Sequence, residues 1–384
     1  MKIAIMGIRG IPANYGGFET FAEELSTRLA QRGHEVTVYG RTNSIKYKDK
    51  YYRGVRLVIL PTISHKYFDT VAHTFLCVCH SLTQNYDAIL VCNSANAIFS
   101  WIPRLKRIPV ALNVDGLEWK RAKWNALGRA FYKLSEWLAT FCVNEVVTDA
   151  RDIEKYYFEK FNKRSTYIPY GAPIGRVETD EVLRRFNLKP KEYVLYVSRF
   201  EPENNPHRVV KAFEQVKTDL KLVMVGDAPY SNDFIREVKS TKDSRIIFTG
   251  YVFGQGYREL QSNAYFYIQG TEVGGTHPAL LEGMGHGNCI LANDVPEHRE
   301  VLGNAGFFFR TGTNGDVTDL RDKMQHLLDN PSLVAQTGHK AQARIHEHYT
   351  WDRITERYEE LFMKLARRKM KNDFNARKAF RTQQ

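Results

Sequence analysis

Short apolar segments alternate with amphipathic ones along most of this chain, and this alternation constrains the fold more than any other feature. Between the first two apolar segments, residues 17–33 carry apolar side chains at helical spacing and end at Gly33. The expected strands of the first half are Lys2–Met6, Glu35–Tyr39, Val55–Leu60, Ala88–Val91, Val110–Asn113 and Glu145–Thr148. Strands that alternate with helices predict an α/β fold with a parallel sheet covered by helices on both faces.

The alternation is interrupted once and then begins again. Residues 168–175 hold two prolines and two glycines, which indicates a linker or hinge. The expected strands after it are Tyr193–Val197, Lys221–Val225, Arg245–Phe248, Tyr265–Ile268 and Cys289–Leu291. The 384 residues are about right for two domains. We predict domains at residues 1–170 and 171–349, and a helical segment at 350–384 that packs back toward the first domain.

Two parallel sheets joined by a hinge predict a cleft, with ligands beyond the carboxyl ends of the strands. The first expected strand leads into a glycine-rich turn, residues 7–17, which ends in Gly16 and Gly17 and opens a helix. Such a turn allows close approach of a ligand, and a helix start attracts anions, although a plain tight turn is the alternative. The turn is not GxGxxG and the second strand does not end in an acid, which disfavours a nicotinamide dinucleotide. Arg41, at the end of that strand, could still bind the 2′-phosphate of a dinucleotide, so this alternative stays open.

The loop after the fifth expected strand, residues 113–124, is rich in charged and aromatic side chains. Asp115 and Glu118 are expected to project into the cleft from the strand end, although first-turn acids of a helix are the alternative. Tryptophan rings offer flat apolar surfaces on which sugars stack, and the neighbouring cations add positive charge. The aromatic and basic residues are Trp119, Lys120, Arg121, Lys123 and Trp124.

Two segments of the second half suggest a diphosphate site. Arg199 follows the first strand of that half, where a guanidinium can bind a diphosphate bidentately; a salt bridge to a neighbouring acid is the alternative. Further on, Gly274 and Gly275 form a flexible turn, and Pro278 suits a first helical turn. The amides that would then face an anion, with the helix dipole behind them, belong to Ala279, Leu280 and Leu281.

Together these segments resemble a retaining glycosyltransferase of family 4 with the GT-B fold, in the bacterial rhamnosyltransferase-like branch. The resemblance is carried by GIRGIPANYGGFET, NVDGLEWKRAKW, SRFEPENN, VGDAPY, TGYV and VGGTHPALLEGM, which span positions 7–284. It implies two Rossmann-like doubly wound domains facing a cleft. It also implies transfer of a sugar from a nucleotide-diphosphate donor, such as dTDP-L-rhamnose, to a glycan or lipid-linked glycan in cell-surface polysaccharide synthesis.

The resemblance also implies roles for single residues. Three are implied to be catalytic: Asp115 stands where many relatives have a histidine near the sugar, Arg199 matches the diphosphate-binding arginine, and Glu282 matches the ribose ligand that ends the E-x(7)-E motif. The residues implied to bind the acceptor are Glu118, Trp119, Lys120 and Arg121. The donor-binding set is Gly16, Gly17, Arg199, Asn204, Tyr251, Val252, Gly274, Gly275, Thr276, Ala279, Leu280, Leu281 and Glu282.

Two positions depart from the family pattern. Asn204 stands where relatives supply a second diphosphate cation, a lysine. Gly274 stands where the first glutamate of E-x(7)-E is expected, and Glu272 lies two residues earlier. The identity of the donor sugar therefore stays open. No Asp-x-Asp motif follows a strand. We therefore expect no cofactor and no metal, with Arg199 and the helix start assisting departure of the diphosphate.

Charge and cysteine content bear on the partners and the compartment. The net charge of +12 suggests an anionic partner, or only a solvated basic surface. The tail 361–384 has eight Lys or Arg against one acid, and the expected helix 122–141 mixes cations with aromatic residues, so we expect peripheral contact with an anionic membrane. Five cysteines without a CxxC pair, no signal peptide and no spanning segment favour the cytoplasm.

Two other functions stay open from the sequence. A sugar-nucleotide epimerase would have the same architecture. A nucleic-acid-binding protein would fit the basic charge, but it needs no diphosphate cradle, so the glycine turns at the strand ends argue against it. We therefore expect no nucleic-acid partner.

Overall fold

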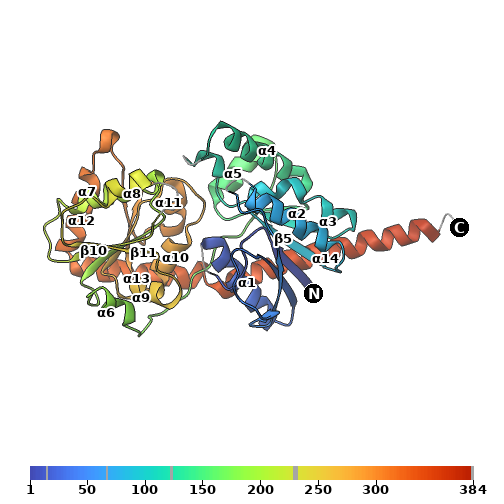
Figure 1. The fold of residues 1–384 in the computed structure, drawn as a ribbon, viewed down its shortest axis with the longest axis horizontal. Coiled ribbons are helices and arrows are strands. Elements are labelled where there is room, and N and C mark those ends of the chain that lie inside the picture. The colour runs from blue at the N-terminus through green and yellow to red at the C-terminus, as the bar shows by residue number, and fades with distance from the viewer. Residues whose placement is uncertain (14–15, 66–67, 122–123, 228–231, 382–384) are drawn as a thin grey trace. The chain divides into compact units, whose positions relative to one another are not determined.

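The computed structural model describes residues 1–13, 16–65, 68–121, 124–227 and 232–381, and it divides into two compact units (Figure 1). Unit 1 comprises Met1–Pro169 and Trp351–Gln384, and unit 2 comprises Tyr170–Thr350. The chain leaves unit 1 inside the proline- and glycine-rich segment and returns to it at the start of the last helix. Each unit has its own sheet and its own core.

Unit 1 is built on an eight-stranded sheet with the order β3-β4-β2-β1-β5-β6-β7-β8, in which only the β3–β4 pair is antiparallel. Its strands are β1 (Lys2–Met6), β2 (Glu35–Arg41), β3 (Tyr51–Tyr52), β4 (Val55–Leu60), β5 (Ala88–Cys92), β6 (Val110–Asn113), β7 (Glu145–Thr148) and β8 (Thr166–Tyr167). Its α-helices are α1 (Gly17–Gln31), α2 (Asp69–Ser81), α3 (Ile102–Leu105), α4 (Ala126–Cys142), α5 (Arg151–Phe161) and α14 (Trp351–Arg381). The continuous apolar strands β1 and β5 are buried on both faces, as expected for a sheet with helices on each side.

The last helix, α14, packs against α1 within unit 1. The rings of Phe21 and Tyr358 lie 5.3 Å apart, and Arg32 pairs with Glu359 at 2.9 Å. The phenol of Tyr358 accepts a hydrogen bond of 2.9 Å from the buried amide of Asn113 at the end of β6. This helix therefore supports the carboxyl edge of the unit 1 sheet, although it lies far away in the sequence.

Unit 2 holds a six-stranded, fully parallel sheet with the order β11-β10-β9-β12-β13-β14. Its strands are β9 (Tyr193–Val197), β10 (Lys221–Val225), β11 (Ile246–Gly250), β12 (Phe266–Gln269), β13 (Cys289–Asn293) and β14 (Phe307–Phe309). Its α-helices are α6 (Glu181–Arg185), α7 (Pro206–Phe213), α8 (Asn232–Val238), α9 (Gly254–Asn263), α10 (Pro278–Gly285), α11 (Pro296–Leu302), α12 (Thr318–Asp329) and α13 (Pro331–His348). The predicted α/β class with two doubly wound parallel sheets is confirmed.

In both sheets the first strand of the unit is central, and later strands add on either side of it. The order reverses between β1 and β5 in unit 1 and between β9 and β12 in unit 2. Open α/β sheets bind ligands at such a switch point, beyond the carboxyl ends of the strands. The loops after these four strands are therefore where a site is expected.

Two element boundaries differ from the expectation for identifiable reasons. The strand expected from Arg245 begins at Ile246, because the Arg245 guanidinium is bonded to Asp243 and to the carbonyls of Val216 and Thr218 in the segment before β10. The helix expected from residue 122 begins at Ala126, because the side chain of Asn125 accepts the Gly128 N–H at 2.9 Å and caps the helix.

Candidate functional site

Arg199 lies in the loop that follows β9, at the switch point of unit 2. Its side chain is 36% exposed, and its Nη1 lies 3.5 Å from the carboxylate of Glu201. The alternative of a salt bridge to a neighbouring acid is thus partly realised. The contact is long and the guanidinium stays accessible, so Arg199 can still receive an anionic ligand.

The departure at Asn204 has a structural reason. Asn204 is buried, its side chain donates to the carbonyl of Arg199 at 2.8 Å, and its own carbonyl accepts the Tyr196 hydroxyl at 2.7 Å. The neutral amide therefore holds the backbone of the Arg199 loop, a task that a lysine could not perform in the same way. The sequence did not indicate this role for Asn204.

The Arg199 loop and the loop after β12 are held against each other within unit 2. The amide of Asn205 donates to the Gly270 carbonyl at 2.8 Å and to the Glu272 carboxylate at 2.9 Å, and the Glu272 N–H donates to the Glu203 carbonyl at 2.9 Å. A Cβ atom at Gly270 would lie 2.6 Å from the Asn204 carbonyl oxygen, so only glycine permits this close approach. The predicted diphosphate arginine and the predicted glycine turn are thus brought together.

The loops after β10 and β11 join the same edge of the sheet. Gly226 has φ +137°, and a Cβ there would lie 1.8 Å from the Ser198 carbonyl oxygen. The Tyr251 hydroxyl donates to the Asp227 carbonyl at 2.8 Å, and the Tyr251 ring stacks on Phe253 at 5.6 Å. Both rings are exposed. They offer a flat apolar surface beside Val252, which belongs with Tyr251 to the predicted donor-binding set.

The glycine turn before α10 is filled by an imidazole. A Cβ at Gly274 would lie 2.4 Å from Cε1 of His277, so the ring occupies the space that a side chain at position 274 would need. The His277 Nδ1 lies 3.0 Å from the Gly275 carbonyl oxygen, and the ring packs edge-on to the buried His298. Thr276 is buried in the same turn. His277 was not singled out from the sequence; the missing glutamate at 274 was the only available signal.

The start of α10 differs from the expectation in one respect. Pro278 occupies the first turn as predicted, but the amides of Leu280 and Leu281 both donate to the His277 carbonyl, at 3.1 and 3.3 Å. Of the three amides expected to face an anion, Ala279 is the one at the second helical position, where a helix offers no acceptor of its own. An anion at this helix start would therefore rely on Ala279 and on the dipole of α10.

Glu282 is oriented by a chain of hydrogen bonds from α9. The Tyr257 hydroxyl donates to its carboxylate at 2.5 Å, and the Gln261 amide donates to the Tyr257 oxygen at 3.0 Å. Burial, and then the Glu282 charge, raise the pKa of Tyr257 well above its usual value, so this phenol remains a proton donor. The carboxylate is half-buried and its direction is fixed before any ligand arrives. No sequence motif indicated Tyr257 or Gln261.

The glycine-rich turn of unit 1 is closed by its own helix. Gly16 is the N-cap and Gly17 the first residue of α1, but the Arg9 N–H donates to the Glu19 carboxylate at 3.0 Å, and the Ala13 N–H donates to Glu23 at 2.6 Å. These two turn amides are therefore not available to an anion, and anion binding at the start of α1 itself stays a prediction. Burial raises the pKa of Glu19, while its hydrogen bond from Arg9 opposes that rise.

Arg41 does not support a nicotinamide cofactor. Its guanidinium is buried, donates to the Asp69 carboxylate at 2.6 Å and donates to the Thr70 hydroxyl at 3.1 Å. A group committed to these partners has a structural role, so a 2′-phosphate is not favoured there.

Asp115 lies at the carboxyl end of β6 in a left-handed conformation, with φ +56°. Asn93, at the end of the neighbouring β5, has φ +74°. Left-handed backbone at a residue other than glycine costs energy and is typical of functional sites. The Asp115 N–H donates to the side chain of Asn113 at 3.0 Å, so the conformation is held by the buried amide that also bonds to Tyr358. Asn93 was not predicted, since no motif distinguishes it.

The acceptor-binding residues of the sequence analysis do not behave alike. Glu118 is buried, pairs with Arg121 at 2.7 Å and accepts the indole N–H of Trp124 at 3.1 Å, so Glu118 and Arg121 hold the loop together. Trp119 packs against the unit 1 core, and the ammonium groups of Lys133 and Lys160 lie 4.7 and 5.9 Å from its ring centre. Its ring is therefore partly covered by the protein's own cations.

Lys120 is exposed and reaches the Trp119 ring at 5.9 Å. Lys123 lies outside the described residues. Among the four predicted acceptor-binding residues, Lys120 is exposed, Trp119 and Arg121 are half-buried and Glu118 is buried.

Two family models match parts of the chain. Residues 191–330, which contain Arg199 and Glu282, match the family described as "Glycosyl transferases group 1". Residues 1–173 match the family described as "Domain of unknown function (DUF1972)".

Two curated relatives align over most of the chain. The N-acetyl-alpha-D-glucosaminyl L-malate synthase of Bacillus anthracis is 23% identical over 96% of this chain and 98% of that protein. The alpha-monoglucosyldiacylglycerol synthase of Streptococcus pneumoniae is 23% identical over 76% of this chain and 71% of that protein. Both identities are low.

Solved structures share the fold. Sucrose-phosphate synthase from Thermosynechococcus elongatus has a TM-score of 0.79 at 17% identity, over 95% of this chain and 98% of that one. Anabaena HepE, solved in complex with UDP-glucose, has a TM-score of 0.74 at 14% identity, over 95% of this chain and 100% of that one. This likeness shows the GT-B type of fold, with two mainly parallel α/β units.

Proposed function

We propose that this chain, a glycosyltransferase of the GT-B type with a group 1 domain at residues 191–330, moves a sugar from a nucleotide-diphosphate donor to a hydroxyl of a glycan or lipid-linked glycan. One observation carries the proposal. Arg199, the start of α10 and the oriented carboxylate of Glu282 all belong to the carboxyl edge of the unit 2 sheet, and the loops after its switch-point strands β9 and β12 are held together.

Each part of a nucleotide sugar has a matching group in unit 2. The diphosphate is met by the Arg199 guanidinium and by the Ala279 amide at the positive end of α10. The ribose diol donates to Glu282, which Tyr257 holds in place. The base lies against Tyr251 and Phe253, with backbone groups of Tyr251 and Val252 in reach of its edge.

The proposed reaction retains the anomeric configuration. The acceptor oxygen attacks the anomeric carbon from the side of the leaving group, the bond from that carbon to the β-phosphate oxygen breaks, and the departing phosphate takes the acceptor proton. Arg199 and the α10 dipole stabilise the negative charge that develops on the diphosphate. Asp115, on unit 1, orients the acceptor hydroxyl. This step depends on positioning and electrostatics rather than on a strong base, and we propose that it proceeds without a metal.

The turn before α10 bears on the proposed donor sugar. His277 occupies the space beside Gly274, where related enzymes carry a glutamate toward the sugar. We propose a 6-deoxy sugar such as L-rhamnose, carried by dTDP, in cell-surface polysaccharide synthesis.

The acceptor is proposed to be presented at the cytoplasmic leaflet of a membrane, to which this protein binds without crossing it. No α-helix in the described ranges is long and apolar enough to span a bilayer. Helix α4 nevertheless presents an apolar face to solvent: Leu127 is 79% exposed, and Leu134, Trp137 and Phe141 continue the stripe. The buried face of the same helix contains Ser135 and Glu136.

This inverted pattern is typical of a helix that meets a lipid interface, since a helix that meets only water exposes its polar face. Arg129 and Lys133 are exposed along α4 and supply attraction to anionic lipids. The curated relatives include a synthase of a glycosylated diacylglycerol, whose name describes a lipid product.

The test of the function is a transfer assay with a donor panel. Purified protein is incubated with dTDP-L-rhamnose, UDP-glucose or GDP-mannose and a membrane-lipid acceptor fraction, and released nucleoside diphosphate and labelled lipid are measured with and without EDTA. The proposal predicts labelled glycolipid from one donor, at a rate that EDTA leaves unchanged. Release of an epimerised sugar nucleotide with no labelled acceptor would instead support the epimerase, which the comparisons do not favour. Activity that EDTA abolishes and Mg²⁺ restores would refute the metal-free route.

A further inference from the structure

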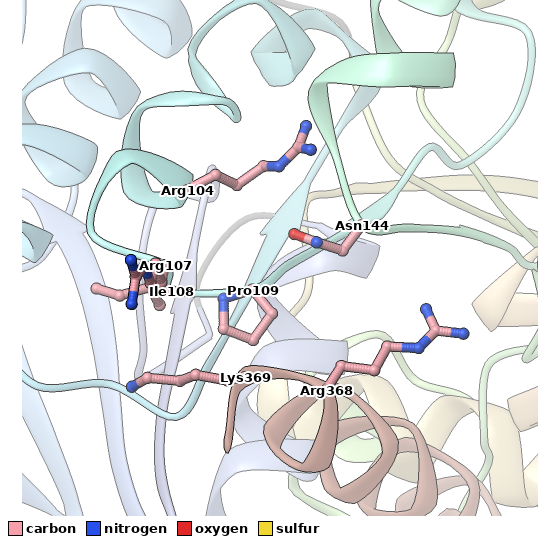
Figure 2. A pocket seen from close by; sticks show the side chains of 7 residues that line it. All are labelled: Arg104, Arg107, Ile108, Pro109, Asn144, Arg368 and Lys369. Atoms are coloured by element: carbon pink, nitrogen blue, oxygen red, sulfur yellow. The ribbon is translucent and has the colours of Figure 1, made fainter. Parts of the chain in front are cut away.

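Unit 1 has a cationic pocket that the transfer reaction does not use. Four cations line it, together with Pro109 and Asn144. Figure 2 shows Arg104 and Asn144 on one side of Pro109, with Arg368 and Lys369 on the other side, where they project from α14. The fourth cation, Arg107, lies in the turn before β6. Segments far apart in the sequence thus contribute positive charge to one hollow.

Most of the partners given for these cations are neutral. The Arg104 guanidinium donates to the Phe141 carbonyl at 2.6 Å, and the Lys369 ammonium donates to the Tyr86 carbonyl at 2.7 Å. Arg368 lies 3.6 Å from the Glu145 carboxylate, which also faces a second lysine of α14 at 3.5 Å and accepts a hydroxyl hydrogen bond. One acid is therefore shared between two cations.

The pocket has an excess of positive charge. Among the described residues, none that lines it is acidic. Carbonyl partners fix the direction of a cation without neutralising it. An anion with several oxygen acceptors, such as a phosphate group, would satisfy both the charge and the remaining donors.

The pocket lies at the opposite end of the unit 1 sheet from the acceptor loop, residues 113–124. Pro109 directly precedes β6 and Asn144 directly precedes β7, so the pocket marks the amino-terminal edge of these parallel strands. The four residues of β6 separate it from Asp115 by a strand length of about 13 Å. It is therefore a different site from the acceptor loop.

Exposed apolar side chains neighbour Arg104, one of the pocket residues. Leu105, next to Arg104 in sequence, is 70% exposed. Phe141, whose carbonyl accepts a hydrogen bond from Arg104, is exposed and packs against the exposed Trp137 at 4.7 Å between ring centres. A free anion would gain nothing from these side chains, whereas the acyl chains attached to a phospholipid phosphate would bury them.

We propose that this pocket binds the phosphate of an anionic phospholipid headgroup, and that the exposed stripe of α4 enters the acyl region beside it. This proposal rests on the proposed membrane association. It adds a specific headgroup site to what would otherwise be diffuse electrostatic attraction. The bound lipid would anchor unit 1 at the end of the sheet opposite to the acceptor loop.

The test compares two double variants of the full-length protein that lose the same charge. Arg368→Gln with Lys369→Gln removes two pocket cations, and Lys46→Gln with Lys48→Gln removes two exposed lysines elsewhere in unit 1. Binding to phosphatidic acid vesicles and to phosphatidylcholine vesicles is measured by co-sedimentation. Thermal stability is measured with and without inorganic phosphate at constant ionic strength. We expect the pocket variant to bind phosphatidic acid vesicles about 10- to 30-fold more weakly, since each basic residue near an anionic surface contributes several-fold. The control should lose less than about threefold.

Several outcomes would overturn the proposal. Equal losses in both variants would mean diffuse attraction without a site. Inorganic phosphate that stabilises the wild type against heat but not the pocket variant, with no vesicle binding by either protein, would mean a soluble anion instead of a lipid.

Nucleotide release from the donor with a detergent-solubilised acceptor fraction, in the absence of vesicles, is measured on the same samples and separates this proposal from the function. If the wild type releases no nucleotide under these conditions, the transferase function is contradicted, while the vesicle result stands or falls by itself.

Discussion

The two units share the order of six core strands, to which unit 1 adds β3 and β8, and they differ at the edge where ligands are expected to bind. In unit 2, the loops after β9 and β12 are held by neutral amides, those of Asn204 and Asn205, and the carboxyl edge presents an accessible arginine. In unit 1, the corresponding turn is closed by Glu19 and Glu23, which take two of its backbone amides. One edge is built to receive an anion, and the other has satisfied its own polar groups.

This difference shows that the sheet alone does not decide the ligand. Both sheets have a switch point, but the contacts beyond it differ: in unit 2 Arg199 stays accessible, whereas in unit 1 two turn amides are bonded to Glu19 and Glu23. Function therefore lies in the loops that the common scaffold presents. Variants in each unit test this difference.

The largest effect is expected from Arg199→Ala in unit 2. Loss of one strong electrostatic donor to the leaving diphosphate should cost about 2–4 kcal/mol of transition-state stabilisation, or roughly 30- to 1,000-fold in turnover. Steady-state transfer kinetics measure the change. Arg184→Ala, an exposed arginine of α6 in the same unit, is the matched control and should leave turnover within about twofold. A folded Arg199→Ala protein with unchanged turnover would remove the diphosphate role.

Acid should destabilise both units by the same mechanism. His73 in unit 1 and His298 in unit 2 are fully buried, and burial lowers the pKa of each to about 4. Because the folded pKa lies below the unfolded value of 6.5, the unfolded chain binds the proton first as the pH falls. Stability is therefore intact above pH 6.5 and is lost progressively between pH 6.5 and 4. Each histidine accounts for about 2 kcal/mol by pH 4.5.

Denaturant unfolding at pH 7 and pH 4.5 measures this loss. His298→Gln and His73→Gln should each make the loss about 2 kcal/mol smaller than in the wild type, while His339→Gln, at an exposed position, should not change it. A wild-type-sized loss in the buried variants would mean that these imidazoles are not the acid-sensitive groups.

A smaller effect is expected from Glu282→Gln. A charge-assisted hydrogen bond contributes about 1.5–3 kcal/mol, and ribose binding is the same in the ground and transition states. The donor KM should therefore rise about 10- to 100-fold while kcat changes little. Tyr257→Phe removes only the orienting hydroxyl and should raise the KM by less than the glutamate change. A fall in kcat at unchanged KM would place Glu282 in the chemical step and not on the ribose.

The smallest effect concerns the closed turn of unit 1. Burial raises the pKa of Glu19 above its unfolded value, so its charged form costs stability at neutral pH. Glu19→Gln keeps an acceptor for the Arg9 amide and should stabilise the protein at pH 7 by under about 1 kcal/mol. The gain should vanish below pH 4.5, where both states are protonated. Denaturant midpoints at pH 7 and 4 report it, and destabilisation at pH 7 would show that the Glu19 charge itself holds the turn.

Several strands were predictable from their continuous apolar runs, although β14 (Phe307–Phe309) was missed. Lys2–Met6, Val55–Leu60 and Tyr193–Val197 begin and end at the expected residues. The two-residue strands β3 and β8 were not predicted, because so short an apolar pattern is set by pairing with a neighbour rather than by its own sequence.

Single residues of the candidate site could be proposed from the sequence, but the hydrogen bonds that hold them in place could not. Arg199, Pro278 and Glu282 follow from strand ends and helix-start chemistry, which are local in sequence. Closure of the unit 1 turn by Glu23, and orientation of Glu282 by Tyr257, depend on contacts between residues ten and twenty-five positions apart. No spacing rule specifies such contacts, since they arise only once helices and loops have packed.

Ligand-dependent thermal stability tests whether unit 2 binds a nucleoside diphosphate. UDP, GDP and dTDP are each added to the wild type and to Arg199→Ala, and unfolding is followed by calorimetry. One nucleotide should stabilise the wild type by about 2.7 kcal/mol at one hundred times its Kd, and Arg199→Ala should lose most of that shift at the same concentration. If none of the three stabilises the wild type, or if Arg199→Ala is stabilised as much as the wild type, the account is contradicted.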